Sequence, residues 1–388
     1  MTAKKARAPG CRNNGRFVVA FILIATLSSI APPAWADPGL SFIDAHTHLL
    51  RNLRRGQGVG DSVSSALSEM NQHGVAMAIL SPPPFAPDSR GLYGLQEEQQ
   101  VARDHPGRFA FTAGGESLNV MIQQTPPDRV TPDVVREFER KAEAIADGGG
   151  AGFGELASEH FSSGRGNHPY ETTPADHPLF LALADIAAKD NMPIELHMEA
   201  IPRDMPFPTD VGPPNPPSVK ENIAAFERLL DHNTAARIVW VHAGWDLSGE
   251  RTVALMHDLL ARHANLYMTI KSDRGGRPQN APLAGDGSGL KPGWIDLLRA
   301  FPDRFIIGSD LFFDDPTPRL DNARAIVDAL PVDIARAVAV DNVKKIYRLA
   351  QDSGSAAPLE REAEPTHEGR RSQDSGGPGS GPRCRNQN

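Results

Sequence analysis

Three residues with metal-binding or acid–base side chains stand close together near the amino terminus. Asp44, His46 and His48 occupy every second position of the segment FIDAHTHLL. In a β-strand this spacing puts all three side chains on one face. Two imidazoles one pleat apart can bind the same cation. A single His-x-His pair is common by chance, so further ligands are needed before it indicates a metal site.

Four further ligand-type residues each end a predicted strand elsewhere in the chain. The strand-like segments GAGFGE, MPIELH, RIVWVH and RFIIGSD finish on a glutamate, two histidines and an aspartate. Because the carboxyl ends of parallel strands meet at one end of a barrel, we expect these side chains to converge with the histidine pair. Chance clustering of this kind is improbable. The predicted metal-binding residues are His46, His48, Glu155, His197, His242 and Asp310.

Imidazoles and carboxylates together favour one or two divalent cations, most of all Zn²⁺, with Mn²⁺ or Ni²⁺ also compatible. Such a cation lowers the pKa of a bound water from ~15.7 toward ~7 and polarises a carbonyl or phosphoryl oxygen. We expect Asp310 to be the catalytic general base, with a plain metal ligand or a helix cap as the alternative. Asp44 either orients His46 or bonds to backbone. Glu195 lies deep in its strand without an assigned partner and rivals Glu155.

Side chains in and beside the loops after the strands are candidates for substrate binding. Lys271 ends the seventh predicted strand, and Trp245 follows His242 by three residues, where it can form a wall of a pocket. Cationic side chains at such places can bind a carboxylate or phosphate, although a solvated loop cation is the more common role for any single one. The predicted substrate-binding residues are His160, Arg165, Tyr170, Trp245 and Lys271.

The elements that must position these residues alternate along the chain. Short β-branched runs predict strands, and longer amphipathic runs between them predict helices. Eight such pairs favour a closed parallel (β/α)8 TIM barrel, with an open doubly wound sheet as the alternative. Long loops follow the fourth, fifth and seventh strands, where barrel enzymes build their pockets. The predicted strands span 41–45, 75–80, 109–113, 152–155, 193–197, 237–242, 266–271 and 305–309, and the predicted helices 61–73, 92–104, 131–147, 179–189, 219–232, 249–263, 293–300 and 319–330.

Both chain ends differ in composition from the segment between them. Residues 1–36 combine a basic start, a short apolar run and Ala-Trp-Ala, which predicts a cleaved signal peptide and export to the periplasm or medium; an uncleaved anchor is the alternative. After cleavage we expect no stable membrane span and no disulfide, since Cys384 alone remains. Residues 351–388 have almost no large apolar side chain and are expected to be disordered. The barrel domain is therefore expected within 37–350.

A formal net charge of −8 argues against a nucleic-acid binder. The sequence also has no GxGxxG motif opening a helix, no Walker loop and no GxSxG elbow. These absences leave a small molecule as the expected partner, and a homo-oligomer is compatible with the composition.

In these motifs the sequence resembles the amidohydrolase superfamily of metal-dependent hydrolases, in particular its amidohydrolase-related (amidohydrolase 2) branch. The resemblance runs from about residue 41 to 349 through FIDAHTHLL, DHPLFLALADIAAKDNMPIELHMEA, IVWVHAGWD, FIIGSDL and DNVKKIYRL. It implies a barrel with a divalent metal. Glu155 stands where some members, such as the TatD-like nucleases, place a bridging glutamate; others use a carboxylated lysine, and many mononuclear members use no bridge. The ligands it implies are His46, His48, His197, His242 and Asp310.

The resemblance implies hydrolysis of a C–N, C–O or P–O bond by metal-activated water. A metal-dependent non-oxidative decarboxylase of an aromatic acid is a second possibility, since the same branch contains such enzymes. A non-catalytic exported binding protein on a barrel scaffold is a third. Glu155 favours the hydrolase, because a second or bridged metal is typical of hydrolysis, and the intact ligand set argues against the binding protein.

Overall fold

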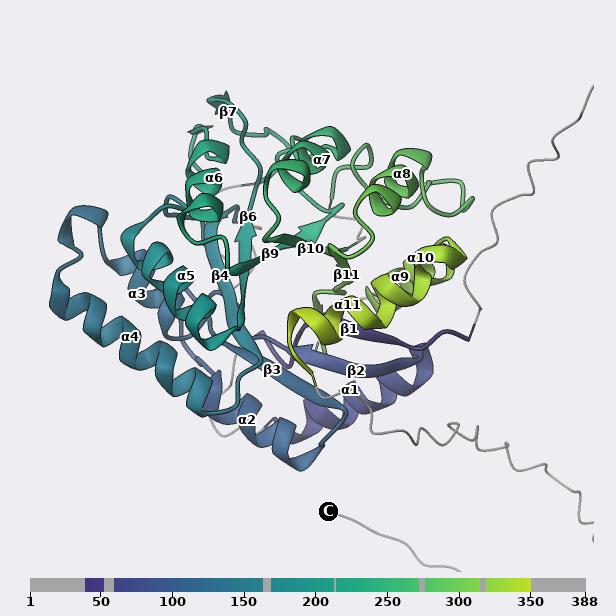
Figure 1. Ribbon diagram of the computed structural model, residues 1–388, viewed down its shortest axis with the longest axis horizontal. Coiled ribbons are helices and arrows are strands. Elements are labelled where there is room, and N and C mark those ends of the chain that lie inside the picture. The colour runs from purple at the N-terminus through teal and green to yellow at the C-terminus, as the bar shows by residue number, and fades with distance from the viewer. Residues whose placement is uncertain are drawn as a thin grey trace, which may run out of the picture. The chain divides into compact units, whose positions relative to one another are not determined.

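A ring of parallel strands forms the centre of the protein, as the computed structural model shows (Figure 1). The strands pair in the order β11-β10-β9-β6-β4-β3-β2-β1-β12. The short strands β11 and β12 follow one another closely and pair with β10 and β1 respectively, so they are two halves of an eighth strand that closes the ring. This confirms the predicted (β/α)8 barrel. The strands are β1 (Phe42–His48), β2 (Val75–Leu80), β3 (Phe109–Gly114), β4 (Gly152–His160), β6 (Pro193–Met198), β9 (Arg237–Ala243), β10 (Leu266–Ile270), β11 (Phe305–Ile307) and β12 (Leu311–Phe312).

The structure describes residues 39–51, 59–162, 169–212, 214–271, 276–314 and 319–349. The predicted signal peptide (1–36), the predicted disordered tail (351–388) and the candidate Arg165 lie outside these ranges. Every predicted strand is present, most with ends that differ by one to three residues, and β4 continues beyond its predicted end. Among the described residues no helix has both the length and the apolar character needed to cross a membrane.

The strands are buried on both faces, as expected for a parallel barrel. In β9, Ile238 and Trp240 pack outward against the helices, while Val239 and Val241 belong to a separate apolar cluster inside the ring. The Trp240 ring lies 5.1 Å from the ring of Phe226 in α6, which shows the outward direction directly. Alternation along one strand therefore divides the helix-facing layer from the lumen.

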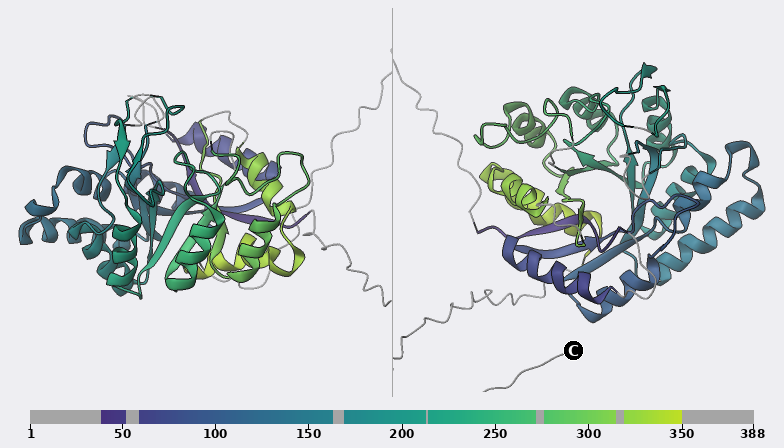
Figure 2. Two further views of the ribbon diagram at one scale, coloured as in Figure 1. Left: turned by 90° about the horizontal axis from the view of Figure 1, so that it is seen from above. Right: turned by 180° about the vertical axis from the view of Figure 1, so that it is seen from behind.

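Helices cover the outside of the ring (Figures 1 and 2). Helix α4 shows how local sequence sets their ends and faces: Thr131 accepts a hydrogen bond from a first-turn N–H, Pro132 occupies the first turn, and Phe138, Ala142 and Ile145 form the buried stripe. The helices are α1 (Gly60–His73), α2 (Leu95–Asp104), α3 (Leu118–Gln124), α4 (Pro132–Asp147), α5 (Pro178–Asp190), α6 (Ile223–His232), α7 (Val253–Arg262), α8 (Pro292–Ala300), α9 (Arg319–Asp328), α10 (Val332–Arg336) and α11 (Asn342–Ile346).

Several helical segments differ from the predictions: α10, the π-helical turn Ala337–Asp341 and α11 were not predicted, and α7 begins at Val253 instead of residue 249. The short α3 lies between β3 and α4, where the sequence predicts no helix. The helix expected at 219–232 begins only at Ile223, because Ser218–Val219 forms β8, which pairs with β7 (Met205–Pro206). Hydrophobic periodicity does not separate a strand end from the helix that follows it, and this accounts for the displaced start.

An apolar cluster fills the amino-terminal end of the barrel, and we call it the barrel floor. Its members on β1, β9 and β11 precede predicted ligands, Ile79 comes from β2, and side chains in and next to α11 complete it. The helix therefore closes the lumen beneath the carboxyl ends of the strands. The floor consists of Ile43, Ala45, Ile79, Val239, Val241, Ile306, Val343, Ile346 and Tyr347.

The opposite end of the barrel carries longer connections. The end of β4 pairs with the short antiparallel strand β5 (Glu171–Thr172), so that His160 lies opposite Glu171. A small apolar cluster, formed by Phe161, Ile201, Phe207 and Val219, lies in the connections after β4 and β6. These connections belong to the end where the predicted ligands stand.

Candidate metal centre

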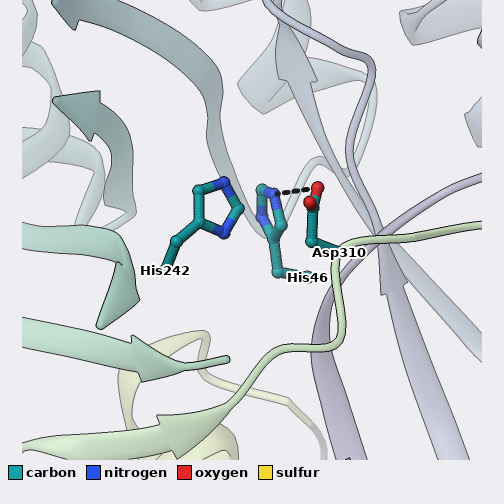
Figure 3. A group of neighbouring side chains, drawn as sticks. All are labelled: His46, His242 and Asp310. Carbon is teal, nitrogen blue, oxygen red and sulfur yellow. Dashed lines mark ion pairs between the residues drawn. The ribbon is translucent and has the colours of Figure 1, made fainter. Parts of the chain in front are cut away.

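Six side chains converge at the carboxyl ends of β1, β4, β6 and β9 and at the break between β11 and β12. They are the six predicted from the sequence. Three overlapping groups each bring one nitrogen or oxygen atom per residue within 4.8 Å of the others. Figure 3 shows one group, in which His46 lies between His242 and Asp310. The groups are His46, His242 and Asp310; His46, His48 and Glu155; and Glu155, His197 and His242.

The carboxylate of Glu155 divides its two oxygens between the histidines. Oε1 lies 3.0 Å from His197 Nδ1 and 3.1 Å from His242 Nε2. Oε2 lies 3.6 Å from His46 Nε2 and 3.7 Å from His48 Nε2. Glu155 is almost fully buried, so all four ring contacts are shielded from solvent. Each oxygen therefore faces its own pair of imidazoles.

Asp310 also uses its two oxygens differently. Oδ1 lies 3.0 Å from His48 Nε2 and 3.9 Å from His46 Nε2. Oδ2 accepts hydrogen bonds from Lys271 Nζ at 2.5 Å and from Arg319 Nη1 at 2.6 Å. Oδ1 thus faces the histidines, while the charged side chains of Lys271 and Arg319 hold Oδ2 in place.

Second partners fix the orientation of the two histidines of β1. His48 Nδ1 lies 2.6 Å from the carbonyl oxygen of Ser81, and the ring stacks on Phe312 at 4.3 Å. His46 Nδ1 lies 3.0 Å from Glu195 Oε2. With Nδ1 engaged in each ring, Nε2 is presented to the centre.

Asp44 bonds to backbone and leaves the orienting role to Glu195. Its Oδ1 accepts hydrogen bonds from the N–H of Ser309 at 2.9 Å and from the N–H of His46 at 3.4 Å. Burial raises the pKa of Asp44 to about 6. Of the two roles considered from the sequence, these contacts correspond to the backbone one, and Asp44 ties β1 to the eighth strand.

The backbone at two of the six positions takes a conformation that L-residues seldom adopt. His242 has φ +68° and Asp310 has φ +55°, both in the left-handed region. Gly154, just before Glu155, has no room for a side chain, since a Cβ there would lie 2.6 Å from the Cβ of Glu195. Strained residues of this kind cluster at functional sites, where the surrounding fold holds them.

The electrostatics of the centre keep its carboxylates charged. Burial by itself would raise the pKa of Glu155, but the surrounding histidines outweigh burial and hold it well below its usual value. Burial also opposes ionisation of Asp310, and the charges of Lys271 and Arg319 outweigh it and hold the pKa well below its usual value. Burial lowers the pKa of His242 well below its usual value, so this imidazole is neutral. Burial opposes protonation of His46, but the carboxylates of Glu155 and Glu195 outweigh burial and raise the pKa of His46 well above its usual value, so a cation that binds this imidazole must displace its proton.

The residues present fit a divalent cation. His46 Nε2 and His242 Nδ1 are buried and have no hydrogen-bond partner among the described residues. A buried ring nitrogen without a partner is costly, and a cation among these atoms would supply the missing interaction for His46 Nε2. Four imidazoles with two carboxylates are a donor set suited to Zn²⁺, Mn²⁺ or Ni²⁺.

The predicted substrate-binding residues fall into three groups. His160, Trp245 and Lys271 lie beside the centre: the rings of His160 and His197 are 4.7 Å apart, and Lys271 Nζ lies 3.8 Å from the centre of the Trp245 ring. Tyr170 instead donates a hydrogen bond to Glu159 Oε1 at 2.7 Å, and its ring packs against the small apolar cluster in the connections after β4 and β6. Arg165, as noted, lies outside the described residues.

Three residues near the centre were not predicted from the sequence. Arg319 opens α9 and reaches Asp310, but a cation at a helix start carries no recognisable pattern. Tyr347 bonds to Glu195 from the far end of the chain. Glu171 lies opposite His160 in the antiparallel pair, and a two-residue strand gives no periodicity signal. Of the three, Tyr347 depends on a contact between segments distant in sequence, 152 positions apart.

A comparison with protein families assigns the chain to one of them. The family model described as Amidohydrolase (Amidohydro_2) matches residues 43–349, and the chain belongs to this family. The chain is therefore an amidohydrolase-family enzyme, and its His/Glu/Asp cluster is able to hold a metal ion. No curated protein matches the sequence.

Solved structures with a similar fold have low sequence identity to the chain. One is a 2,6-dihydroxybenzoate decarboxylase complexed with 2,6-dihydroxybenzoate: identity is 15%, coverage is 80% of this chain and 99% of that chain, and the TM-score is 0.45. Another is a probable 2-pyrone-4,6-dicarboxylic acid hydrolase from Acinetobacter baumannii with citric acid bound. Its sequence identity is 13%, the match covers 80% of this chain and 100% of that chain, and the TM-score is 0.45. A third is dihydroorotase from Saccharomyces cerevisiae. Its sequence identity is 14%, the match covers 82% of this chain and 87% of that chain, and the TM-score is 0.47.

Proposed function

We propose that the chain is a metal-dependent hydrolase whose centre binds two divalent cations, with Zn²⁺ preferred and Mn²⁺ or Ni²⁺ as substitutes. The substrate is a small molecule with a C–N, C–O or P–O bond open to attack by water. The proposed ligands are the six side chains that converge at the strand ends, and Asp310 is the proposed general base. The observation that carries this proposal is that the two carboxylate oxygens of Glu155 face different pairs of histidines.

Glu155 has the geometry expected of a bridging ligand. Its Oε1 faces His197 and His242, and its Oε2 faces His46 and His48, so each oxygen belongs to a separate pair of imidazoles. A single cation would need only one of these oxygens. Two cations sharing one carboxylate is an arrangement used in hydrolytic two-metal sites.

The residues around Asp310 support its role as the base. A bound divalent cation lowers the pKa of water toward neutrality and polarises the bond under attack. Lys271 and Arg319 hold Oδ2 of Asp310, which keeps Oδ1 directed at the histidines and able to accept a proton there. The same carboxyl can then release the proton to the leaving group. Trp245, beside Lys271 and His242, is a proposed wall of the substrate pocket.

One observation favours a second function, metal-dependent non-oxidative decarboxylation of an aromatic acid. Lys271 Nζ lies 3.8 Å from the centre of the Trp245 ring, and the nearly buried Lys271 belongs to the centre through Asp310. A cation next to an aromatic plate suits a flat substrate with a carboxylate. Release of CO2 from aromatic acids distinguishes this function from hydrolysis.

The proposal is tested by turnover of the Zn²⁺-loaded protein on aryl esters, lactones, amides and phosphate esters, alongside aromatic acids. We expect hydrolysis in at least one class, and we expect Asp310→Asn to lower kcat by roughly 10²- to 10⁴-fold, the usual contribution of a general base. Glu159→Gln is the matched control, because Glu159 lies on β4 but bonds to Tyr170 and Thr172. CO2 release without hydrolysis would replace the hydrolase proposal by the second function.

We also propose that the enzyme acts outside the cytoplasm. The support is the sequence of residues 1–36, in which a basic start and a short apolar run precede Ala34-Trp35-Ala36. Amino-terminal sequencing of the protein recovered from a bacterial periplasm or medium is expected to begin at Asp37. A mature protein that begins at Met1 and remains with the membrane would overturn this.

A further inference from the structure

A buried chain of hydrogen bonds runs from the end of the described residues to a predicted metal ligand. The hydroxyl of Tyr347 donates a hydrogen bond to Glu195 Oε1 at 2.7 Å. The other oxygen of Glu195, Oε2, lies 3.0 Å from His46 Nδ1. Relative exposure is 3% for Tyr347 and 0% for Glu195 and His46, so water does not compete for these contacts.

The two ends of this chain belong to different parts of the barrel. Tyr347 follows α11 and is a member of the barrel floor, where it packs with Val343 and Ile346. Its ring is therefore held by apolar contacts, and its hydroxyl reaches into the lumen toward Glu195 on β6. His46 stands above the floor on β1, with its Nε2 toward Glu155 and Asp310.

Glu195 has a defined role in this arrangement. Its Oε2 takes the Nδ1 side of the His46 ring, which leaves Nε2 as the nitrogen presented to the centre. Its Oε1 would be a buried oxygen in need of a partner, and the Tyr347 hydroxyl supplies one. Held at both oxygens, the carboxylate has a fixed orientation, and the His46 ring is fixed with it.

We propose that Tyr347 and Glu195 are positioning residues, whose hydrogen bonds fix the ring of His46 and so set its affinity for the metal. This inference rests on the proposed metal centre. Neither residue is a ligand in this account, and neither touches substrate. Loss of the hydroxyl leaves the floor packed but releases Glu195, and the affinity for the cation falls although all six ligands remain.

The test is the dissociation constant for Zn²⁺ of the full-length protein, measured by competition with a chromophoric chelator. Loss of a partner that orients a metal ligand commonly weakens metal binding by roughly 10- to 100-fold, which is the effect expected for Glu195→Gln. Tyr347→Phe keeps the ring and the Glu195 charge, so a smaller loss, of about 3- to 10-fold, is expected. The absorption spectrum of the Co²⁺-substituted protein should change in both variants, because the His46 ring is released.

Two control variants separate this role from a merely structural one. Tyr267→Phe removes a hydroxyl from a ring that packs against the same floor, and no side-chain hydrogen bond of Tyr267 is recorded among the described residues. Ile346→Val disturbs the packing of the floor without removing a polar group. Both are expected to bind Zn²⁺ as the unaltered protein does, whatever happens to their melting temperatures.

The outcomes also separate this inference from the proposed function. If the unaltered protein binds Zn²⁺ and Tyr347→Phe binds it with the same constant as Tyr267→Phe, the coupling is wrong while the metal centre stands. If the unaltered protein binds no divalent cation, the proposed function itself is wrong. A folded Tyr347→Phe protein with weakened metal binding and unchanged controls supports the coupling.

Discussion

The two ends of the barrel bury side chains of opposite character. At the floor, Ile43, Val239 and Ile306 pack against α11, and the contacts are almost entirely apolar. At the opposite end, six ionisable side chains from β1, β4, β6, β9 and the break between β11 and β12 meet. The floor contributes burial energy, whereas the carboxyl end gathers charge that burial disfavours.

The difference is also visible in the backbone. His242 and Asp310 adopt left-handed conformations at the carboxyl end, and His46 Nε2 and His242 Nδ1 lack partners among the described residues. A fold tolerates such costs only where other regions overdetermine the chain. We infer that the floor supplies stability and that the carboxyl end uses part of it to hold a constellation ready for a cation.

The largest expected effect comes from a substitution at the carboxyl end of the barrel. His242→Ala removes a ring that faces Glu155 Oε1 at 3.1 Å, so metal content and turnover should fall together, with activity lost by at least ~100-fold. Metal analysis and steady-state kinetics on the same sample measure both. Normal metal stoichiometry in this variant would count against the assignment of His242.

The second-largest expected effect comes from a substitution in the barrel floor. Ile346→Ala deletes apolar atoms from a side chain that is 1% exposed and leaves a cavity, so the free energy of unfolding should fall by about 2–5 kcal/mol. Urea denaturation followed by circular dichroism measures this loss, with Val332→Ala on the exposed face of α10 as the control. A loss no larger than that of the control would show that the floor contributes little to stability.

The smallest effect concerns Glu171 at the carboxyl end. Burial, reinforced by the charges of Glu155 and Asp88, raises the pKa of this carboxyl from 4.5 to about 8. The folded protein therefore binds this proton more tightly than the unfolded chain, and the stability it contributes below pH 4.5 is lost as pH rises through about 8.

The variant Glu171→Gln has no such proton to lose. Melting temperatures measured between pH 5 and pH 8.5 should fall more steeply for the unaltered protein than for Glu171→Gln, by a few degrees over the range. Glu69→Gln, on an exposed surface of α1, is the control. Parallel curves for all three proteins would mean that Glu171 ionises normally in the fold.

The sequence predicted the barrel well because its signals are local. Buried runs such as RIVWVH identify strands, and Thr131-Pro132 identifies a helix start, from neighbouring residues alone. The alternation of strands and helices then leaves few topologies. The short α3 and the strand pair β7–β8 were missed, since segments this short have no measurable period.

The convergence of the six side chains was likewise predictable, because strand ends of one barrel meet at one face. Their partners were not. Glu195 was recognised as a buried carboxylate in need of a partner, but Tyr347 stands 152 positions away and only the closed fold brings it there. The left-handed backbone at His242 and Asp310 also depends on the surrounding barrel, since both residue types prefer other conformations.

Counting the metal ions in crystals of the unaltered protein and of Glu155→Ala by anomalous scattering tests the central claim most directly. The account predicts two peaks in the unaltered protein, one near His46 and His48 and one near His197 and His242, with Glu155 between them. It predicts at most one peak in Glu155→Ala. A single peak in the unaltered protein would contradict the bridging role of Glu155, and a site without any peak after soaking with Zn²⁺ would contradict the metal centre.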